Sequence, residues 1–347
     1  MKSEIYTPAP DDWHGHMRFG ALLLMIAKWV SQQFRRVVAM GNVPAVTTLE
    51  KALEYDQECN SATKPLGCTT LVSPRINRHT TPELVHAFCK AGFWRLKLYL
   101  EGTTTGAEDG VSNIALLFPI FEMMQQLNMV LQIHAEVPGT WRWADTAMRE
   151  DLCLPLVYLI HQNFPKLRIV IEHVSSGRTI AFLQDVPPDI VAGTVTEQHL
   201  RDNANDVRGG LIDPHKVWKP EAKTRADQMI IGSAVYGGRM RNLFSGNDWA
   251  AHPISKKGPG LISSGGFHAP GLIPRLWGLF EKNADAERFA RFTSFAGADF
   301  YQVPRNTDRL VLTRESWQVP ISDGEGENEV VIYRGGEILD FKVQGFV

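Results

Sequence analysis

A short stretch near the N-terminus carries two histidines at a spacing that suits a metal ion. It reads Asp11-Asp12-Trp13-His14-Gly15-His16-Met17-Arg18. Side chains alternate between the two faces of a β-strand, so His14 and His16 are expected on one face and Gly15 on the other. Two imidazoles on one face can hold a divalent cation, and Arg18 can bind an anion beside it. The alternative is a pair of ordinary surface or core histidines.

Further isolated polar residues favour a site over that alternative. Each lies at the end of an apolar, strand-like run, and they are Lys97, His134, His173 and Asp248. One histidine at a strand end is commonly just a hydrogen-bonded residue. Several such residues at successive strand ends are expected to meet, because the carboxyl ends of the strands of an α/β barrel converge on one mouth.

Strand-like and helix-like runs alternate along most of the chain, which predicts a (β/α)₈ TIM barrel. After the opening strand, the expected strands are Arg35–Met40, Leu66–Ser73, Trp94–Leu100, Met129–His134, Leu167–His173, Asp189–Val195 and Arg241–Asp248. The alternative, an open doubly wound sheet, ordinarily has a glycine-rich phosphate turn after an early strand. The sequence contains no G-x-G-x-x-G motif and no P-loop.

The expected helices lie between these strands. They are Ala21–Phe34, Leu49–Cys59 with Thr47 or Thr48 as its cap, Pro82–Ala91 capped by Thr81, Asn113–Leu127, Trp143–Phe164, a short helix to Gln184 capped by Ser175 or Ser176, Glu221–Tyr236, and two between Ala269 and Gly297. Thr196–Pro220 is expected to be irregular, and Pro253–Gly266 to form a glycine-rich loop. We expect a barrel over residues 1–307 and a small β appendage packed on it over residues 308–347.

Composition excludes several classes of function. The chain has 347 residues, 44% of them hydrophobic, which is enough for one large core. A net charge of −2 and a pI of about 6.6 give no indication of nucleic acid or an anionic membrane as partner. The four cysteines are scattered, as in a reduced, cytosol-like compartment. The N-terminus lacks a signal-peptide core, and the apolar stretch Ala21 to Ala27 is too short to span a bilayer. We expect a cytoplasmic protein.

Lys97 is the most informative of the strand-end residues. In Trp94-Arg95-Leu96-Lys97-Leu98-Tyr99 it shares a strand face with Arg95 and Tyr99. An ammonium beside bound divalent metal would be repelled. A neutral lysine amine that has taken up CO₂ becomes a carboxylate, which could bridge two metal ions. The alternative is a salt-bridged lysine at the barrel mouth.

Taken in order, these motifs resemble those of a dihydroorotase of the single-domain class, within the amidohydrolase superfamily. The resemblance runs from residue 11 to about residue 305. Its motifs are the stretch from Asp11 to Arg18, Met40-Gly41-Asn42, Lys97-Leu98-Tyr99, Ile133-His134-Ala135-Glu136-Val137, Ile171-Glu172-His173, Thr196-Glu197-Gln198-His199-Leu200, Asp213-Pro214-His215, Gly246-Asn247-Asp248-Trp249-Ala250-Ala251-His252 and Phe267-His268-Ala269-Pro270.

The resemblance implies a centre of two zinc ions. His14, His16 and Asp248 would hold one ion, His134 and His173 the other, and carboxylated Lys97 (N6-carboxylysine) would bridge them. A hydroxide between the ions would be the nucleophile, and Asp248 would transfer the proton. The implied contacts to a substrate carboxylate are Arg18, Asn42 and His252, with Thr104 and Thr105 on a loop that closes over the substrate.

The sequence also departs from the family pattern near these motifs. Gly15 replaces a bulkier residue, Phe19 an acidic one and Gly41 a proline, while the loop after Thr105 reads Gly-Ala-Glu-Asp where Asn-Ser is more usual. Trp249 and Ala251 replace a small residue and a proline. The metal-ligand set is intact, but these changes predict an altered pocket.

Three functions are compatible with these observations. The first is the reversible interconversion of dihydroorotate and N-carbamoyl-aspartate in pyrimidine biosynthesis. The second is a paralogous reaction on another cyclic amide or imide, and the third is a catalytically silent scaffold. The expected partner is a small molecule with a carboxylate, and a homodimer is compatible with the sequence.

We expect the purified chain to contain two divalent ions, most readily zinc, because histidine and carboxylate ligands without thiolate suit it. Elemental analysis of protein prepared without chelator is expected to give about two equivalents per chain from this ligand count. One equivalent or none, with no activity gained on adding metal, contradicts the two-ion centre.

Overall fold

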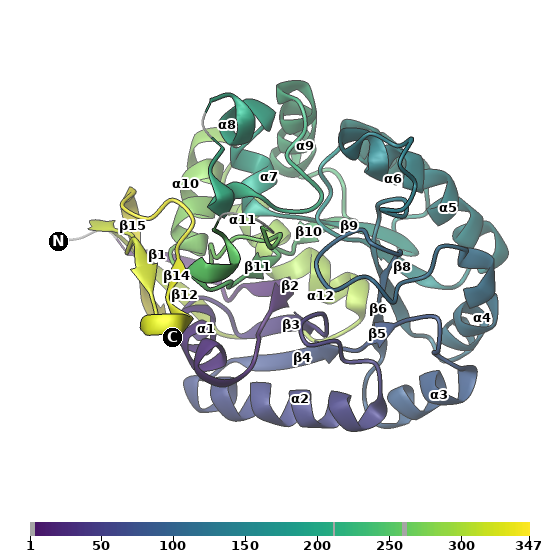
Figure 1. Cartoon of the computed structure of the whole chain (residues 1–347). Helices are drawn as coiled ribbons and strands as arrows, with labels where there is room; N and C mark the ends of the chain where they lie inside the picture. Colours follow the sequence, from purple (N-terminus) through teal and green to yellow (C-terminus); the bar gives the residue numbers. More distant parts are fainter. Residues whose placement is uncertain (1–3, 211, 259–261) are drawn as a thin grey trace.

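Parallel strands form a ring at the centre of the computed structural model, and helices surround it (Figure 1). The structure describes residues 4–210, 212–258 and 262–347. The ring is made of β2 (Asp11–His16), β3 (Arg36–Met40), β4 (Thr69–Ser73), β5 (Arg75–Ile76), β6 (Arg95–Tyr99), β7 (Val130–His134), β8 (Arg168–Ile171), β9 (Val191–Val195), β10 (Leu243–Ser245) and β11 (Trp249–Ala250).

These strands pair as two parallel sheets in the orders β11-β2-β3-β4 and β5-β6-β7-β8-β9-β10. The chain itself joins the sheets twice, through Pro74 between β4 and β5 and through residues 246–248 between β10 and β11. Pro74 has no N–H to donate to a ladder, and its carbonyl accepts from Lys97 N at 2.8 Å. Counting each interrupted strand once, the described strands occupy the eight positions of a (β/α)₈ barrel, which confirms the predicted fold.

The helices that cover the ring begin mostly at side-chain caps. They are α1 (Gly20–Ser31), α2 (Leu49–Thr63), α3 (Pro82–Lys90), α4 (Phe118–Gln126), α5 (Arg149–Asn163), α6 (Gly177–Asp185), α7 (Glu197–Arg201), α8 (Ala204–Arg208), α9 (Arg225–Gly237), α10 (Leu272–Asn283), α11 (Ala286–Ala290) and α12 (Ala296–Tyr301). Thr48, Thr81 and Ser176 cap α2, α3 and α6 by accepting from backbone N–H groups. The predicted cap at Thr81 is confirmed, and the open choices resolve to Thr48 and Ser176.

Several predicted boundaries are wrong, for local reasons. The helix expected from Glu221 begins at Arg225, where Thr224 caps it, and the strand expected from Leu66 begins at Thr69, after a 3₁₀ turn over Lys64–Leu66. The segment from Thr196 to Pro220, expected to be irregular, contains α7 and α8, because Thr196 and Asn203 each cap a short helix. The strand expected over 241–248 breaks after Ser245, where the chain turns toward β2. The helix expected from Trp143 begins at Arg149, after a 3₁₀ turn over Thr146–Met148. Part of the glycine-rich loop, residues 259–261, lies outside the described residues.

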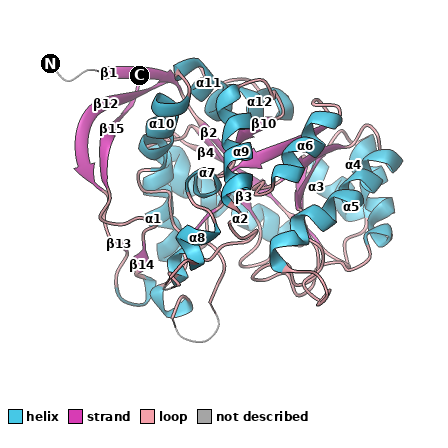
Figure 2. Ribbon diagram, turned by 90° about the horizontal axis from the view of Figure 1, so that it is seen from above, coloured by secondary structure: helices cyan, strands magenta, loops and turns pink. Residues whose placement is uncertain are grey.

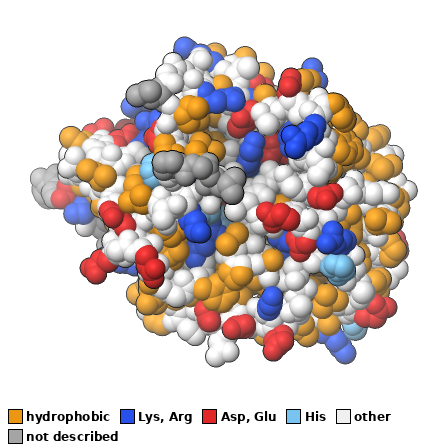
Figure 3. All heavy atoms as spheres, in the orientation of Figure 1, with side chains coloured by type: hydrophobic (Ala, Val, Ile, Leu, Met, Phe, Trp, Pro, Cys, Tyr) orange, Lys and Arg blue, Asp and Glu red, His pale blue; other side chains and the backbone are white. Residues whose placement is uncertain are grey.

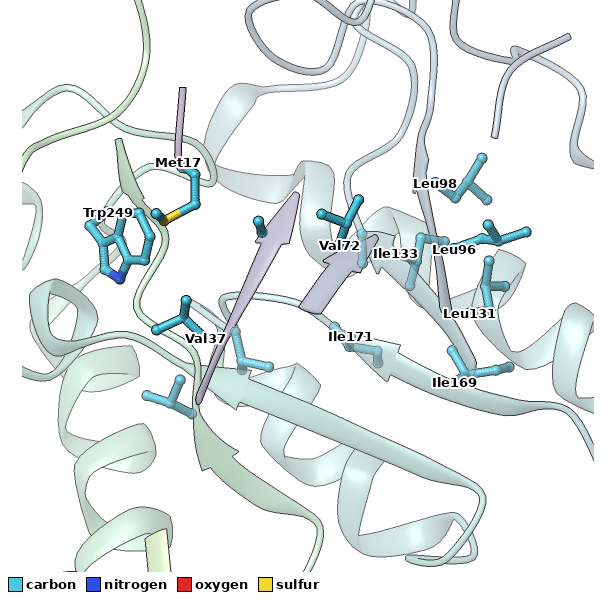
Figure 4. Close-up of a cluster of buried hydrophobic side chains, with 14 of the residues drawn as sticks. Met17, Val37, Val72, Leu96, Leu98, Leu131, Ile133, Ile169, Ile171 and Trp249 are labelled. Carbon is cyan, nitrogen blue, oxygen red and sulfur yellow. The ribbon is translucent and has the colours of Figure 1, made fainter. Parts of the chain in front are cut away.

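Strand alternation separates two cores. Residues facing the helices include Val37, Leu96, Leu98, Leu131, Ile133, Ile169 and Ile171 (Figure 4). A second set of residues faces the barrel axis and packs with Phe244 and with Tyr301 of α12; it includes Val38, Val130 and Val170. On β7, His134 has the same parity as Val130, so alternation alone places its imidazole inside the barrel.

β2 departs from simple alternation. Its pairing with β3 shifts register between Asp12 and Gly15. Trp13 therefore packs in the inner core while the next residue, His14, lines the cavity above it. A bulge of this kind re-aims a side chain, and here it lets two consecutive residues serve the barrel interior.

A second, antiparallel sheet lies beside the barrel (Figures 1 and 2). It has the order β1-β12-β15, and its bounds, with those of a small hairpin, are β1 (Glu4–Pro8), β12 (Arg309–Gln318), β13 (Ser322–Asp323), β14 (Val330–Val331) and β15 (Ile338–Phe346). Arg201 bonds Glu337 at 2.6 Å and Tyr333 donates to Asp202 at 2.7 Å, which ties this sheet to α7. The sheet takes strands from both ends of the chain, and a division at residue 307/308 stays a prediction. None of the helices described is long and apolar enough to cross a membrane.

Two departures from the family pattern compensate each other behind the site. Gly15 on β2 is paired with Trp249 on β11. A Cβ on Gly15 would lie 2.1 Å from the indole ring of Trp249, so only glycine fits. Trp249 is fully buried, and its Nε1 donates to Asp12 Oδ2 at 2.8 Å. Neither residue lines the cavity described below, so this exchange does not alter the pocket.

We expect Gly15→Leu and Trp249→Ser each to destabilise the fold and the double variant to recover part of the loss. The leucine overpacks the ring, at about 1–3 kcal/mol, and the serine leaves a cavity, at about 3–5 kcal/mol. Urea unfolding of the metal-free protein measures all three. Strictly additive losses contradict the complementary packing.

Candidate active site

Three ligand-type side chains from opposite ends of the chain meet at the mouth of the barrel. Asp248 Oδ1 lies 2.9 Å from His16 Nε2 and 3.2 Å from His14 Nε2. The three donor atoms lie within 4.8 Å of one another, close enough to share one metal ion. Burial alone raises the pKa of a carboxyl group, but the two imidazoles hold the pKa of Asp248 well below its usual range. The carboxylate is therefore ionised in this site.

A second pair of imidazoles lies beside this group. His134 Nδ1 and His173 Nε2 face each other at 2.9 Å, and the rings of His14 and His173 are 5.2 Å apart. Burial lowers the pKa of both His134 and His173, so both rings are neutral near pH 7. Neutral imidazoles have the lone pairs that a metal ion needs.

Buried carboxylates orient two of these rings from behind. Glu172 Oε2 lies 2.7 Å from His14 Nδ1 and also accepts from Thr194 Oγ1 at 2.7 Å. Glu136 Oε2 lies 2.7 Å from His134 Nε2. A carboxylate that accepts from one ring nitrogen fixes the tautomer and turns the other nitrogen, here His14 Nε2 or His134 Nδ1, toward its neighbours. The sequence motifs contain both glutamates, but sequence reasoning gave them no role.

The backbone is held in unusual conformations at this mouth. Arg18, His173 and Asp248 have φ values of 65°, 44° and 55°, in the left-handed region that non-glycine residues rarely adopt. Hydrogen bonds hold two of them there: His173 N donates to Thr194 Oγ1 at 2.7 Å, and Asp248 N donates to His14 O at 2.8 Å. Backbone strain of this kind collects where a side chain must be aimed.

Lys97 lies beneath the histidines, fully buried. Its Nζ has no hydrogen-bond partner among the described residues and lies 4.9 Å from the centre of the Tyr99 ring. Burial lowers the pKa of Lys97 to about 8, while the carboxylates of Glu172 and Asp248 act in the opposite direction. An unsatisfied amine at this depth indicates that a group is to be added to it or bound beside it.

These donors fit divalent metal. Four buried imidazoles, one ionised carboxylate and an unpartnered lysine amine form a nitrogen–oxygen set without thiolate. Zinc accepts such ligands.

Arg18, Asn42 and His252 form the opposite wall. Arg18 Nε donates to Ala251 O at 3.0 Å, and its Nη2 lies 3.2 Å from His252 Nε2. Burial and the nearby guanidinium lower the pKa of His252, so Arg18 supplies the positive charge of this wall. A guanidinium with a free edge can bind a carboxylate through two hydrogen bonds.

The loop of residues 102–110, which carries Thr104 and Thr105, is fastened over the cavity. Thr105 Oγ1 accepts from Ser264 N at 3.1 Å. Arg75, at the end of β4–β5, is 1% exposed, donates to Gly106 O and forms an ion pair with Asp109. Within the described chain, Asp109 is the carboxylate that pairs with this buried guanidinium.

The ligands and both walls line one open cavity at the mouth of the barrel. Its lining is His14, His16, Arg18, Asn42, Val43, Tyr99, Thr104, Thr105, His134, His173, Lys219, Asp248, Ala250, His252, Ser264 and Gly265. The structure thus brings together every predicted site residue except Lys97, which lies behind the lining. It adds Tyr99 and Lys219, which sequence reasoning did not assign.

A buried ion pair supports the chain just after His173. Glu150 bonds Lys223 Nζ at 3.0 Å, Ser175 N at 3.1 Å and Thr179 Oγ1 at 2.6 Å. Although burial opposes ionisation of both groups, Lys223 and the hydroxyl donors lower the pKa of Glu150, and Glu150 raises that of Lys223. The network fixes the turn from β8 into α6 that follows His173.

Curated relatives resemble the chain over nearly its whole length, whereas no family model matches it. The dihydroorotase of Aliivibrio fischeri (strain MJ11) is 35% identical over 338 residues, covering 96% of this chain and 98% of the relative. The mitochondrial dihydroorotase of Oryza sativa subsp. japonica is 33% identical over 343 residues, covering 97% of this chain and 84% of the relative.

Solved structures agree. A dihydroorotase from Campylobacter jejuni superimposes with a TM-score of 0.89 at 28% identity, and a Saccharomyces cerevisiae dihydroorotase in complex with 5-fluoroorotic acid with a TM-score of 0.91 at 26% identity. Each covers 99% of this chain and 98% of its own. The L-hydantoinase (dihydropyrimidinase) of Arthrobacter aurescens, at 16% identity and a TM-score of 0.77, covers 98% of this chain and 83% of its own and shares the fold.

We expect Asp109→Ala to destabilise the chain, because it leaves the Arg75 guanidinium buried without a counter-ion. Asp109 is partly exposed and water can enter, so the expected loss is about 2 kcal/mol. Urea unfolding measures it. Glu54→Ala, at an exposed position of α2, is the control, with an expected change below about 0.5 kcal/mol. Equal stabilities of the two variants contradict the role of Asp109.

Proposed function

The chain belongs to the dihydroorotase family, and from this premise we propose that it catalyses the reversible interconversion of dihydroorotate and N-carbamoyl-aspartate. The observation that carries the proposal is the pairing of two features in one cavity. A nitrogen–oxygen ligand group lies on one wall, and an arginine with no carboxylate partner within the described chain lies on the other. Such a cavity suits a small cyclic amide that bears a carboxylate.

We propose that the ligand wall holds two zinc ions. His14, His16 and Asp248 would bind one ion, and His134 and His173 the other. Lys97, as an N6-carboxylysine, would bridge them; its fully buried, unpartnered Nζ supports this. Bound divalent metal supplies a low pKa for water and polarises a carbonyl group.

The other wall orients the substrate. Arg18 would bind the substrate carboxylate, with Asn42 and His252 as neighbouring hydrogen-bonding groups. Thr104 and Thr105 would close the cavity from above, where Thr105 already contacts Ser264. Excluding water at this point strengthens the charged contacts inside.

Asp248 would move the proton. Hydrolysis adds water to the ring amide carbonyl and breaks the C–N bond, and the departing nitrogen gains a proton. Among the described residues, the hydrogen bonds and ion pairs of this carboxylate use Oδ1, so Oδ2 is the atom available to carry that proton. In ring closure, the same oxygen would take the proton back.

Three finer properties belong to this proposal. The four cysteines are free, which supports a reducing, cytoplasmic location. The expected division is a barrel over residues 1–307 with an appendage over residues 308–347. The sheet shared by both ends of the chain supports an appendage that packs on the barrel. A homodimer stays a prediction.

A direct assay tests the proposed function. We expect the zinc-loaded protein to hydrolyse dihydroorotate and to cyclise N-carbamoyl-aspartate. Arg18→Met removes the charged contact to the carboxylate and is expected to raise the KM for dihydroorotate on the order of 30-fold or more, from the 2–5 kcal/mol lost when a buried charge pair is broken.

Hydantoin, a cyclic imide without a carboxylate, is the matched control substrate. If wild-type protein turns over hydantoin and not dihydroorotate, the reaction is that of a paralogue on another cyclic amide. If Arg18→Met leaves the KM for dihydroorotate unchanged, the carboxylate contact is wrong.

A further inference from the structure

The cavity contains a second cation that neither the sequence motifs nor the proposed function uses. Lys219 lines it together with Arg18 and His252. Its side chain is half-buried and, within the described chain, has no hydrogen bond or ion pair. Ammonium groups at a protein surface ordinarily extend into water, so position alone does not give Lys219 a role.

The backbone around Lys219 is fixed on both sides. Trp218 is 2% exposed and packs with Tyr333, their rings 5.9 Å apart. The carbonyl of Pro220 lies 3.1 Å from His199 Nε2. Before Trp218, the carbonyl of Val217 accepts from Lys257 Nζ at 3.2 Å. The base of the Lys219 side chain therefore has a defined position at the cavity.

This segment lies on the Arg18 side of the cavity. Val217 O also accepts from Gly265 N at 2.9 Å. A Cβ built on Gly265 would lie 3.2 Å from His252 Nε2, and the neighbouring Ser264 O contacts the same nitrogen at 2.9 Å. His252 in turn lies 3.2 Å from Arg18 Nη2. A continuous set of contacts thus connects the Lys219 segment to the wall formed by Arg18, Asn42 and His252.

The charges in the cavity are unbalanced. Asp248 is the carboxylate among the lining residues, and its Oδ1 is engaged by His14 and His16. Arg18 and Lys219 remain without an anionic partner in the described chain. Figure 3 shows Lys and Arg interspersed with Asp and Glu over the face seen in Figure 1. Within the cavity lining, by contrast, Arg18 and Lys219 face a single carboxylate, which the histidines already engage.

We propose that Lys219 binds the substrate carboxylate together with Arg18, as a residue that determines affinity for acidic substrates. This inference rests on the proposed function and adds a specificity residue to it. The carboxylate is the one that dihydroorotate and N-carbamoyl-aspartate share. Lys219 acts in binding and takes no part in proton transfer.

The test compares three variants at matched positions. Lys219→Met keeps the length of the side chain and removes its charge, and Lys219→Arg restores the charge. Lys216→Met removes a charge from the same segment at a residue outside the cavity lining. Thermal unfolding of each variant checks that the fold is retained.

We expect Lys219→Met to raise KM about tenfold for both dihydroorotate and N-carbamoyl-aspartate, the size of one charge-assisted hydrogen bond in a partly solvated site, with kcat within about twofold. The equilibrium constant requires kcat/KM to fall equally in both directions, so the split between KM and kcat is the informative result. Lys219→Arg is expected to recover most of the loss, and Lys216→Met to match the wild type.

Four results overturn the proposal. An unchanged KM in Lys219→Met, or an equal rise in Lys216→Met, shows that the charge at this position does not contact the substrate. A rise in KM for N-carbamoyl-aspartate alone moves the contact to the carboxylate that hydrolysis releases. A fall in kcat at constant KM assigns Lys219 to the chemical step.

Binding of 5-fluoroorotate, followed by calorimetry, gives the same comparison without turnover. If the wild-type protein is inactive on both substrates, the proposed function fails. A weaker affinity of Lys219→Met for 5-fluoroorotate, restored in Lys219→Arg, would still support the anion contact, and equal affinities would refute it.

Discussion

One buried carboxylate holds the two ends of the barrel together at the site. Asp12 accepts from Asn247 N at 2.9 Å, from Asn247 Nδ2 at 3.0 Å, from Trp249 Nε1 at 2.8 Å and from His14 N at 3.3 Å. Burial raises the pKa of Asp12 to about 6 against the lowering effect of these donors. β10 and β11 are not continuous, and these bonds act together with the bond from Asp248 N to His14 O and the pairing of β11 with β2 to hold Asp248 against β2. Closure of the barrel and the position of the ligand group therefore depend on the same contacts.

Two of the histidines likewise depend on shared hydrogen-bond partners. Glu172 serves His14 across the barrel while its own neighbour, His173, is fixed by Thr194, which also donates to Glu172. A change at Thr194 would therefore reach two ligands through one hydroxyl. Such coupling makes the ligand positions depend on buried hydrogen bonds more than on packing, because each bond has few alternative partners at this depth.

The barrel was predictable from the sequence because it depends on short-range rules, and the same rules bring most of the candidate ligands to one mouth. Alternation places His134 inside the barrel, and strand ends gather His173 and Lys97 at one mouth. The pocket's other residues depend on contacts that no local pattern encodes. Lys219 follows an irregular segment, and its place beside the cavity results from the distant partners His199 and Gly265. The acidic neighbours of the histidines were visible in the motifs, but the contact of Glu172 with His14 and Thr194 joins separate strands, and no local pattern encodes it.

The departures from the family pattern named above, all of them among the described residues, lie outside the lining of the cavity. Gly15 and Trp249 pack against each other across one strand pair behind the ligands. The indole ring of Trp249 fills the space that a side chain at position 15 would occupy. Such an exchange conserves packing and leaves the chemistry of the cavity to other residues. Lys219, which no motif singled out, lines the cavity itself and brings a charge to it. Electrostatic attraction acts over longer distances than steric contact. We therefore expect the substrate preference of this protein to depend on the charges of Arg18 and Lys219 more than on the volume of the pocket.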